Sequence, residues 1–404
     1  MFLKELSRIF KSEKETSLNK KLLILDVSSA SVGGIVIETK GDEPIKILSK
    51  HRFHSNFLPD LDFEAFLRTT MGALKKVTEK IKKEPSGNIN KALCVFGSPW
   101  FIAETKVVQI ERDLPFEITE HFFEDVLRDE TNALEEKFRV VGSGYSKFGK
   151  EVPLIIESKF LKTKLNGYRT ESPVGKKASK VESEIYMSMG AKEVAEKITK
   201  HIDKVFDVDQ VVFRTFPYVA FQTIHSLFNS SDGFLFIEIS GETTDLILVK
   251  DESIEEYISF PKGRNTLMRK ISSSFNSFPK EIHSLVKAYV AGHLDGNDQD
   301  KMIKAIEEAK MEWCTEFKKV FELIKHQTPL PQDLYLLGGD GISRKFIQCV
   351  EDDYFSAFTT LGKPFNLRSI NPGSLSNFFN QTQSSLKIDD VSLIMESLYA
   401  RKNL

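Results

Sequence analysis

FLFIEISGETTDLILVK, residues 234–250, is the stretch of sequence that decides the predicted fold. Its two apolar runs, FLFIEI and LILV, are rich in branched and aromatic residues, and a small polar turn joins them, which is the pattern of a β-hairpin. The turn has two interpretations. It is either an ordinary hairpin turn or a phosphate-binding loop, in which backbone N–H groups and the hydroxyls of Ser240, Thr243 and Thr244 line a hollow.

A second stretch repeats this design near the start of the chain. LLILD, residues 22–26, predicts a buried strand that ends in the carboxylate of Asp26. The small-residue turn VSSAS follows, and residues 32–38 and 45–50 predict two more strands. Two hairpins of this kind are a more specific signal than one, and they predict two related half-molecules that face each other across a nucleotide.

The composition is that of a globular protein with two or more domains. The chain has 404 residues, of which 41% are hydrophobic and 28% charged, enough apolar material for more than one core. A net charge of -2 gives no electrostatic case for nucleic acid as a partner. Cys94, Cys314 and Cys349 are odd in number and far apart, which favours a reducing compartment. No apolar run reaches transmembrane length and no signal peptide is visible, so we expect a cytoplasmic protein.

The first residues, MFLKELSRIFKS (1–12), have helical spacing. Apolar residues fall on one face and charged residues on the other, and a polar linker follows to residue 21. Such a helix lies either on a membrane surface, with nearby lysines facing the lipid head groups, or against its own domain or a partner. The sequence leaves both interpretations open.

Residues 101–188 differ in character from the segments around them. A short strand comes first, and a helix follows from Thr119, a suitable N-cap, to about residue 137. The stretches 153–170 and 178–189 alternate with the period of two that marks strands. Strand, helix, strand and strand together predict a small α+β unit inserted into the larger fold.

The rest of the chain alternates between helices and strands. We expect helices at 63–83, 191–206, 217–227, 264–275, 280–291, 298–324 and 390–401, strands at 91–96, 208–213, 253–260 and 333–337, and a loop-rich segment at 364–387. The strand at 333–337 runs into GGDGIS, and a glycine-rich turn lets the backbone approach a flat ligand or a phosphate closely.

Three segments, LILDVSSASVG, IEISGETTDLILV and LYLLGGDGIS, together resemble the actin-like ATPase superfamily. They correspond in order to its first phosphate loop, second phosphate loop and adenosine turn. The 101–188 unit is similar to the SHS2 (1C) subdomain of the FtsA family of cell-division proteins, with the PilM family as a near relative. Local matches are ITE at 118–120, LNGYR at 165–169 and FPKGRN at 260–265. The resemblance implies an α/β, two-lobed actin-like (ribonuclease H-like duplicated) fold with an inserted SHS2 subdomain.

The resemblance also implies a domain organisation. It consists of a segment and linker at 1–21, lobe 1 at 22–100 and 189–230, the insertion at 101–188, lobe 2 at 231–384 and a closing helix at 385–404 that returns to lobe 1.

Site residues follow from the resemblance position by position. Asp26 would hold Mg²⁺ through water, as suits a small cation that keeps its hydration shell. The phosphate and nucleotide contacts would come from Ser28, Ser29 and Ser31, from Gly241, Thr243 and Thr244, from Gly338, Gly339 and Gly341, and, for the base or ribose, from Lys287.

Two departures from the family pattern bear on catalysis. Glu238 and Ser240 stand where the second loop usually has aspartate and glycine, so Glu238 would be the second catalytic and metal-binding carboxylate. Residues 214–217, RTFP, offer no acidic or amide group to position a water, which phosphate hydrolysis requires. We therefore expect Mg·ATP binding with weak or no hydrolysis, at most a slow ATPase. His51 and His54 have a spacing that could serve a metal, but no acidic partner is evident beside them.

The leading functional hypothesis is an FtsA-like scaffold at the inner face of the cell membrane. It would link division proteins to the membrane through the 101–188 insertion and self-assemble into filaments. FtsA proteins usually end in an amphipathic helix, which is missing before Leu404, so residues 1–12 are the candidate membrane contact. The alternatives are a PilM-like scaffold that binds a short peptide of an inner-membrane pilus protein, and a small-molecule kinase. The insertion occupies the place of the kinase substrate pocket, and no catalytic base is evident.

Overall fold

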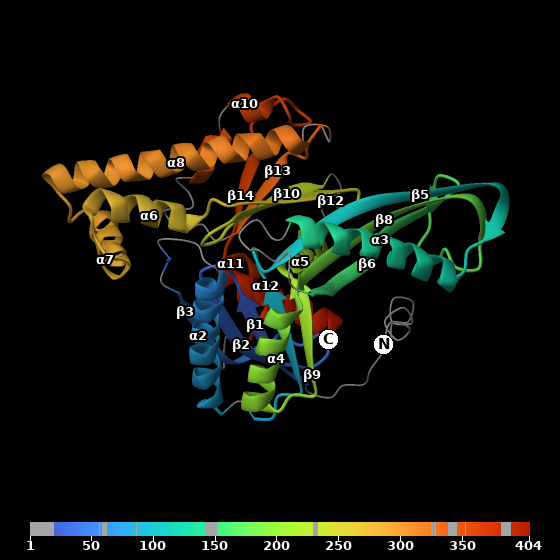
Figure 1. Ribbon diagram of the computed structural model, residues 1–404, viewed down its shortest axis with the longest axis horizontal. Helices are drawn as coiled ribbons and strands as arrows, with labels where there is room; N and C mark the ends of the chain where they lie inside the picture. Colours follow the sequence, from blue (N-terminus) through green and yellow to red (C-terminus); the bar gives the residue numbers. More distant parts are fainter. Residues whose placement is uncertain are drawn as a thin grey trace.

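Two five-stranded sheets with the same strand order form the centre of the molecule (Figure 1). This computed structural model describes residues 20–55, 57–58, 63–85, 87–141, 152–228, 233–324, 326, 329–337, 346–351, 353–380 and 389–404. The predicted helix at 1–12 and the glycine-rich turn at 338–341 lie outside these ranges.

The first sheet has the order β3-β2-β1-β4-β9 and the second β12-β11-β10-β13-β14. In each sheet the three strands that come first in the chain pair antiparallel with one another in succession. The two strands that come later in the chain lie on the other side of the earliest strand and run parallel to it. The strands of the first sheet are β1 (Lys20–Val27), β2 (Ser31–Thr39), β3 (Lys46–His54), β4 (Lys91–Phe96) and β9 (Gln210–Thr215). Those of the second are β10 (Phe234–Ile239), β11 (Thr244–Lys250), β12 (Ser253–Phe260), β13 (Asp333–Leu337) and β14 (Asn366–Ile370). One architecture is thus used twice.

Helices cover both faces of each sheet. The outer face of the first sheet packs on α2 (Phe63–Lys82) and α4 (Lys192–Phe206), and that of the second on α6 (Arg264–Phe275) and α8 (Gly296–Ile324). Between the sheets lie α5 (Phe216–Phe228) and α12 (Val391–Asn403), whose apolar side chains share one core with both sheets.

The strand sequences explain this layering. In β1, Leu22 and Ile24 face the shared core, whereas Leu23 and Leu25 face the helices on the outer side. Successive side chains of a strand point to opposite faces, so a strand buried on both sides reads as a continuous apolar run. LLIL is such a run, and FLFI of β10 is its counterpart in the second sheet.

The insertion projects sideways from the two lobes (Figure 1). Its sheet has the order β5-β8-β6-β7, and α3 packs on β6 and β8. Its elements are β5 (Phe101–Glu117), α3 (Glu120–Val141), β6 (Pro153–Leu165), β7 (Tyr168–Arg169) and β8 (Lys177–Ala191). Thr119 accepts a hydrogen bond from the backbone N–H of Phe122 at 3.1 Å, which confirms the predicted N-cap.

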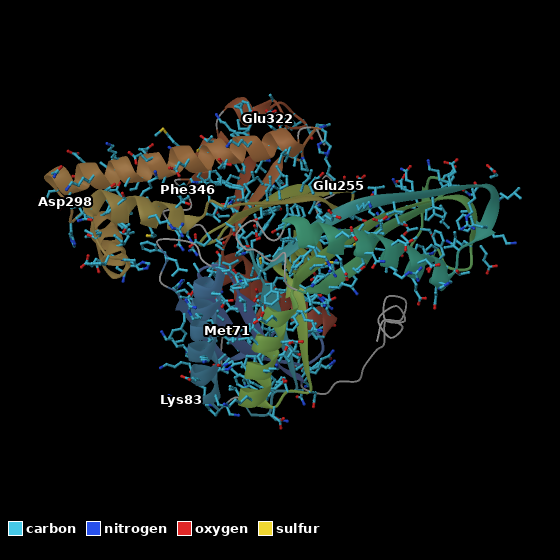
Figure 2. All side chains as sticks on the ribbon, in the orientation of Figure 1. Met71, Lys83, Glu255, Asp298, Glu322 and Phe346 are labelled. Carbon is cyan, nitrogen blue, oxygen red and sulfur yellow. The ribbon has the colours of Figure 1, made fainter. Side chains whose placement is uncertain are left out.

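Side chains fill the space between the ribbons (Figure 2). In that view the labels Asp298 and Glu322 lie near the two ends of α8. The helix α7 (Pro279–Val290) follows α6 and packs against it at the edge of the second lobe. The short helical elements after β13 are η3 (Gln348–Glu351), α10 (Asp353–Ser356), α11 (Pro372–Leu375) and η4 (Ser376–Phe378). The segment expected to be loop-rich, 364–387, also contains the strand β14, which the sequence did not predict. β14 lies at the edge of its sheet and is partly exposed. Its sequence, NLRSI, therefore contains polar residues and lacks the continuous apolar run of a buried strand. Among the helices of the described ranges, none is both long and apolar enough to cross a membrane.

Candidate functional site

Asp26 and Glu238 occupy equivalent positions in the two sheets. Each is the last residue but one of the first strand of its sheet, β1 or β10. Across the sheet, Gly33 lies beside Asp26 and Arg52 beside Gly33, whereas Asp245 lies beside Glu238. The resemblance between the two hairpin sequences therefore corresponds to a real structural equivalence, but the neighbours of the two carboxylates differ.

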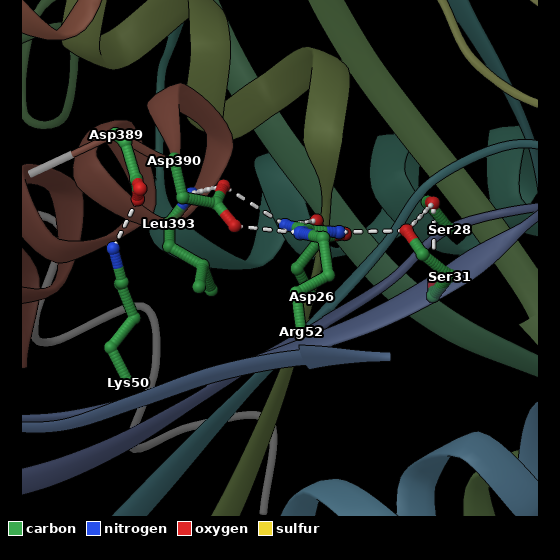
Figure 3. Close-up of polar contacts among 8 residues, drawn as sticks. All are labelled: Asp26, Ser28, Ser31, Lys50, Arg52, Asp389, Asp390 and Leu393. Atoms are coloured by element: carbon green, nitrogen blue, oxygen red, sulfur yellow. Dashed lines mark hydrogen bonds and ion pairs between the residues drawn. The ribbon is translucent and has the colours of Figure 1, made fainter. Parts of the chain in front are cut away.

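Arg52 joins three elements around Asp26 (Figure 3). Its Nη2 donates to the Asp26 carboxylate at 2.6 Å, and its Nη1 donates to the hydroxyl of Ser31 at 2.8 Å. Its Nε and Nη2 donate to the two carboxylate oxygens of Asp390 at 2.6 and 3.0 Å. Asp390 in turn caps α12 by accepting from the backbone N–H of Leu393 at 3.3 Å. One guanidinium thus connects β1, the first loop and the start of α12.

Gly33 is the reason that Arg52 can reach Asp26. Arg52 must cross over β2, and a Cβ atom at position 33 would lie 2.7 Å from Nη2 and 2.8 Å from Cζ of Arg52. Contacts of that length between heavy atoms are repulsive. Glycine at this position leaves room for the guanidinium where it lies, and a larger residue would require Arg52 to shift.

The protonation equilibria reflect this burial and pairing. Burial raises the pKa of Asp26, and attraction to Arg52 only partly offsets the effect. Burial is also the largest influence on Asp390 and acts to raise its pKa, but the attraction and hydrogen bonds of Arg52, the Leu393 N–H and the charge of Lys50 together outweigh it, and the pKa is lowered. For Arg52 itself, burial favours the neutral form, but the two carboxylates outweigh it and raise the pKa. Arg52 therefore stays charged, as arginine does in proteins.

The two predicted phosphate loops touch each other directly. The hydroxyl of Ser29 lies 2.8 Å from that of Ser240 and accepts a hydrogen bond from the backbone N–H of Glu242 at 2.9 Å. A Cβ atom on Gly241 would lie 2.1 Å from Cβ of Ala30, so only glycine permits this approach. The loops are in van der Waals and hydrogen-bond contact across the line where the two lobes meet.

The remaining polar groups of the second loop are bonded within lobe 2. The hydroxyl of Thr243 lies 3.0 Å from that of Ser240, and the backbone N–H of Ser240 donates to the carbonyl of Thr243 at 2.9 Å. Thr244 donates to the carbonyl of Lys262 at 2.6 Å and accepts from Trp313 at 2.8 Å. The hydroxyls of the second loop that were predicted to line a phosphate site are therefore hydrogen-bonded to other groups of the protein.

Three further carboxyl groups lie near Asp26 or across from it. Burial raises the pKa of Glu238 well above its usual value, and repulsion by Asp245 and Asp26 adds to the rise. Burial likewise raises the pKa of Asp245 to about 6. Glu396, on α12, is fully buried, neither of its carboxyl oxygens has a hydrogen-bond partner, and burial and the charge of Asp26 raise its pKa. At all three positions the neutral acid form is therefore more favoured than it would be in water.

The other predicted site residues are more dispersed. Gly338, Gly339 and Gly341 lie outside the described residues, so the adenosine turn stays a prediction. Lys287 is exposed on α7 and lies on the same helical face as His283. The pKa of His54 is lowered, first by burial, and His283 is close enough to contribute to this shift.

His51 lies 2.8 Å from Glu84. The expectation that it has no acidic partner is therefore wrong, because the partner comes from a distant loop. Within the described part of the chain, no three His, Cys, Asp or Glu side chains gather as a metal site.

Magnesium and a nucleotide phosphate do not fit the loops in this arrangement. A cation at Asp26 would meet the positive charge of Arg52, and a phosphate between the loops would have to separate Ala30 from Gly241. The backbone N–H of Glu242, one of the donors that such a phosphate would need, is already bonded to Ser29.

A separate cavity of about 230 Å³ lies in the insertion, between α3, β6 and the segment after β7. Its apolar lining comes from Phe123, Phe160, Leu161, Pro173 and Val174. Charged groups at its border are Glu120, Lys162, Arg169 and Glu171. Small-molecule sites usually measure about 300–1,000 Å³. This cavity is smaller, and its size suits one or two apolar side chains with a polar backbone around them.

Two residues that line the cavity also contact lobe 2. Arg169 is paired with Glu252 at 2.6 Å, and Lys162 lies 3.5 Å from Asp251. Both acids belong to the turn between β11 and β12, where they adopt left-handed backbone angles, φ 47° and 62°. The cavity is therefore bordered by a turn that continues directly from the second predicted phosphate loop through β11.

Duplicated sheets, helices between and outside them and an inserted α+β unit define an actin-like ATPase fold. A chain of the PilM–PilN type IV pilus biogenesis complex aligns with a TM-score of 0.61 and 14% identity, over 94% of this chain and 98% of that one. A protein of unknown function with an actin-like ATPase fold from Bacteroides thetaiotaomicron aligns with a TM-score of 0.44 and 8% identity, over 94% and 96%. The ethanolamine utilization protein EutJ from Carboxydothermus hydrogenoformans gives 0.42 and 13%, over 88% and 86%. No family model and no curated protein matches the sequence.

Proposed function

We propose that this protein is an actin-fold scaffold that binds a short peptide segment of a membrane protein in the cavity of its insertion. The observation that carries the proposal is the cavity itself, which is apolar inside, charged at its border and too small for a nucleotide. The PilM–PilN complex, whose chain shares this fold, is an assembly of two proteins in type IV pilus biogenesis. A PilM-like role is therefore the proposal that we favour over an FtsA-like one.

The sheet of the insertion supports recognition of an extended peptide. Within the described strands, β7 pairs only with Lys164 and Leu165 of β6, so most of β6 has a neighbour on one side alone. An exposed strand edge can accept an added strand through main-chain hydrogen bonds, while a pocket beside it selects a side chain. The ligand that fits is a short segment with one or two large apolar anchors.

Peptide binding can be tested with a variant that fills the cavity. Val174 lines the cavity and is half-buried, so Val174→Trp places a bulky ring in the space that the anchor would occupy. Synthetic peptides covering the non-membrane segments of pilus-assembly and cell-division membrane proteins from the same organism would be screened by fluorescence anisotropy. We expect at least one peptide to bind, and its affinity to fall about 10-fold or more in Val174→Trp, a loss typical of a binding hot spot.

Val107→Trp is the matched control. Val107 is 52% exposed on β5, at the opposite edge of the same sheet, so a tryptophan there adds equal bulk away from the cavity. The control variant should bind the peptide as the native chain does. Binding that survives in Val174→Trp, or is lost equally in both variants, would contradict the proposal. The source of the bound peptide distinguishes a pilus partner from a division partner.

We further propose that residues 1–12 hold the scaffold on the inner face of the membrane. The amphipathic pattern of this segment supports the proposal, which depends on electrostatic attraction to anionic lipid as well as on apolar burial. Deletion of residues 1–12 should reduce co-sedimentation with phosphatidylglycerol-containing liposomes. Unchanged co-sedimentation would refute this membrane contact without affecting the peptide proposal.

A further inference from the structure

We propose that Arg52 takes the place of a bound cation at Asp26, and that direct contacts between the two loops hold the lobes together, so that this scaffold is clamped without Mg·nucleotide. The proposal concerns the seam between the lobes and is independent of the peptide cavity. Failure of either proposal leaves the other standing.

Arg52 is surrounded by acceptor oxygen atoms. Its guanidinium is bonded to two carboxylates and one hydroxyl, from Asp26, Asp390 and Ser31. The arrangement gathers oxygen atoms from several elements around one positive charge, as a metal ion would. A guanidinium does so with fixed geometry and permanent charge. A divalent cation that bound to Asp26 would have to displace Arg52 and leave Asp390 without its partner.

The sequence also makes room for this arginine. Gly33 removes the side chain that would otherwise block the path of Arg52 across β2 to Asp26. Asp390, at the N-cap of α12, holds the other side of the guanidinium. Three separate parts of the chain are thus matched to one side chain.

The opposing loops are in direct contact. Ser29 bridges to Ser240 and to the backbone N–H of Glu242. Glu242 itself is buried, 4% exposed, and paired with Arg269 at 2.7 Å and with Asn265 at 2.6 Å. The second loop is therefore fixed from behind by α6 while it presses on the first loop.

Nucleotide binding to the native chain is the primary test. Isothermal titration calorimetry and thermal unfolding would be measured with millimolar Mg·ATP and Mg·ADP on the full chain. We expect no saturable heat and no shift in the unfolding midpoint. Saturable binding of either nucleotide to the native chain would overturn the proposal, and loss of that binding in Asp26→Asn would identify Asp26 as the cation ligand instead.

A double-mutant comparison tests the role of Arg52 directly. Arg52→Ala should lower the unfolding midpoint by about 5 °C or more, because it leaves buried carboxylates uncompensated. Adding Asp26→Asn to Arg52→Ala removes one of those charges and should restore part of the lost midpoint. A double variant no more stable than Arg52→Ala would overturn the assignment of Arg52 as the internal cation.

Gly33→Ala provides a second, milder variant. It keeps the charge of Arg52 but obstructs its path, so it should destabilise the native chain and have a smaller effect when Arg52 is already alanine. Additive losses would contradict the proposed path. Lys50→Ala is the matched control, since Lys50 lies two positions away on β3 and pairs with Asp389, whose side chain is 65% exposed. This control should change the midpoint little.

Discussion

The hydroxyl oxygens of Ser29 and Ser240 lie 2.8 Å apart, although 211 positions separate the two residues in the chain. Further bonds cross between the lobes, and two of them involve side chains away from the loops. Ser98 and Tyr257 join their hydroxyls at 2.6 Å, and Arg269 donates to the carbonyl of Leu58 at 3.0 Å. The lobes are therefore positioned by contacts among the protein's own groups, and each contact can be removed singly.

Ser29→Ala removes the hydroxyl that joins the first loop to the second across the two lobes. It leaves the buried N–H of Glu242 without its acceptor, and an unsatisfied buried donor costs about 1–3 kcal/mol. We expect a loss of that size in the free energy of unfolding measured by urea denaturation. Ser28→Ala is the control, because the Ser28 hydroxyl bonds only locally to Ser31. Equal losses in the two variants would show that the bond across the lobes has no special weight.

Gly241→Ala tests the close approach of the two loops. The new methyl group would lie 2.1 Å from Cβ of Ala30, and overpacking of this kind costs about 1–3 kcal/mol. Replacing Ala30 by glycine in the same chain removes the atom that is struck. Chemical denaturation should therefore show that Ala30→Gly restores part of the stability lost in Gly241→Ala. If the second change brings no recovery, the loops are not in contact as described.

Much of the framework could be predicted from local sequence. The bounds of β10, β12, β4 and α6 agree with the predicted elements, because apolar runs and turn residues act over a few positions. The second sheet's hairpin and its counterpart at β1 and β2 were recognisable for the same reason.

The central contact of the site could not be predicted in this way. Whether Arg52 faces Gly33 depends on the register between β2 and β3, and a bulge between Val36 and Ile37 shifts that register. Asp390 reaches Arg52 only because the chain returns from the second lobe. A glycine within a strand pattern, at position 33, was the one local signal of a close approach.

Asp245 makes the stability depend on pH in a specific window. Burial raises its pKa to about 6, whereas an unfolded aspartate titrates near 3.9. The folded state therefore holds more protons between these values, and stability must fall as pH rises from about 4 to 6. In Asp245→Asn this contribution is absent. The free energy of unfolding of the native chain minus that of the variant should therefore fall by about 3 kcal/mol between about pH 4 and pH 6.

The substitution also removes the repulsion that helps to raise the pKa of Glu238, so both effects act in the same direction. Urea denaturation of the two proteins at a series of pH values measures the difference. A constant difference from pH 4 to pH 7 would show that the Asp245 carboxyl is not shifted.

Glu157 joins the insertion to the first lobe. It is 1% exposed on β6, accepts from the backbone N–H of Thr215 at 2.7 Å and from its hydroxyl at 3.0 Å, and is also bonded to the Ser188 hydroxyl. The sequence offered no sign of this contact, because 58 positions separate Glu157 from Thr215. Since the carboxylate satisfies several donors at once, it fixes the base of the sheet that carries the cavity.

Glu157→Ala should therefore lower the free energy of unfolding by about 1–3 kcal/mol for the donors left unpaired. Glu157→Gln keeps the shape and one carbonyl acceptor for the Thr215 N–H, so its loss should be smaller. Hydrogen exchange would localise the effect, with faster exchange expected in β6 and β9 than in β10. If alanine and glutamine were equally tolerated, or if exchange changed only within the second lobe, the carboxylate would not be the link between the insertion and lobe 1.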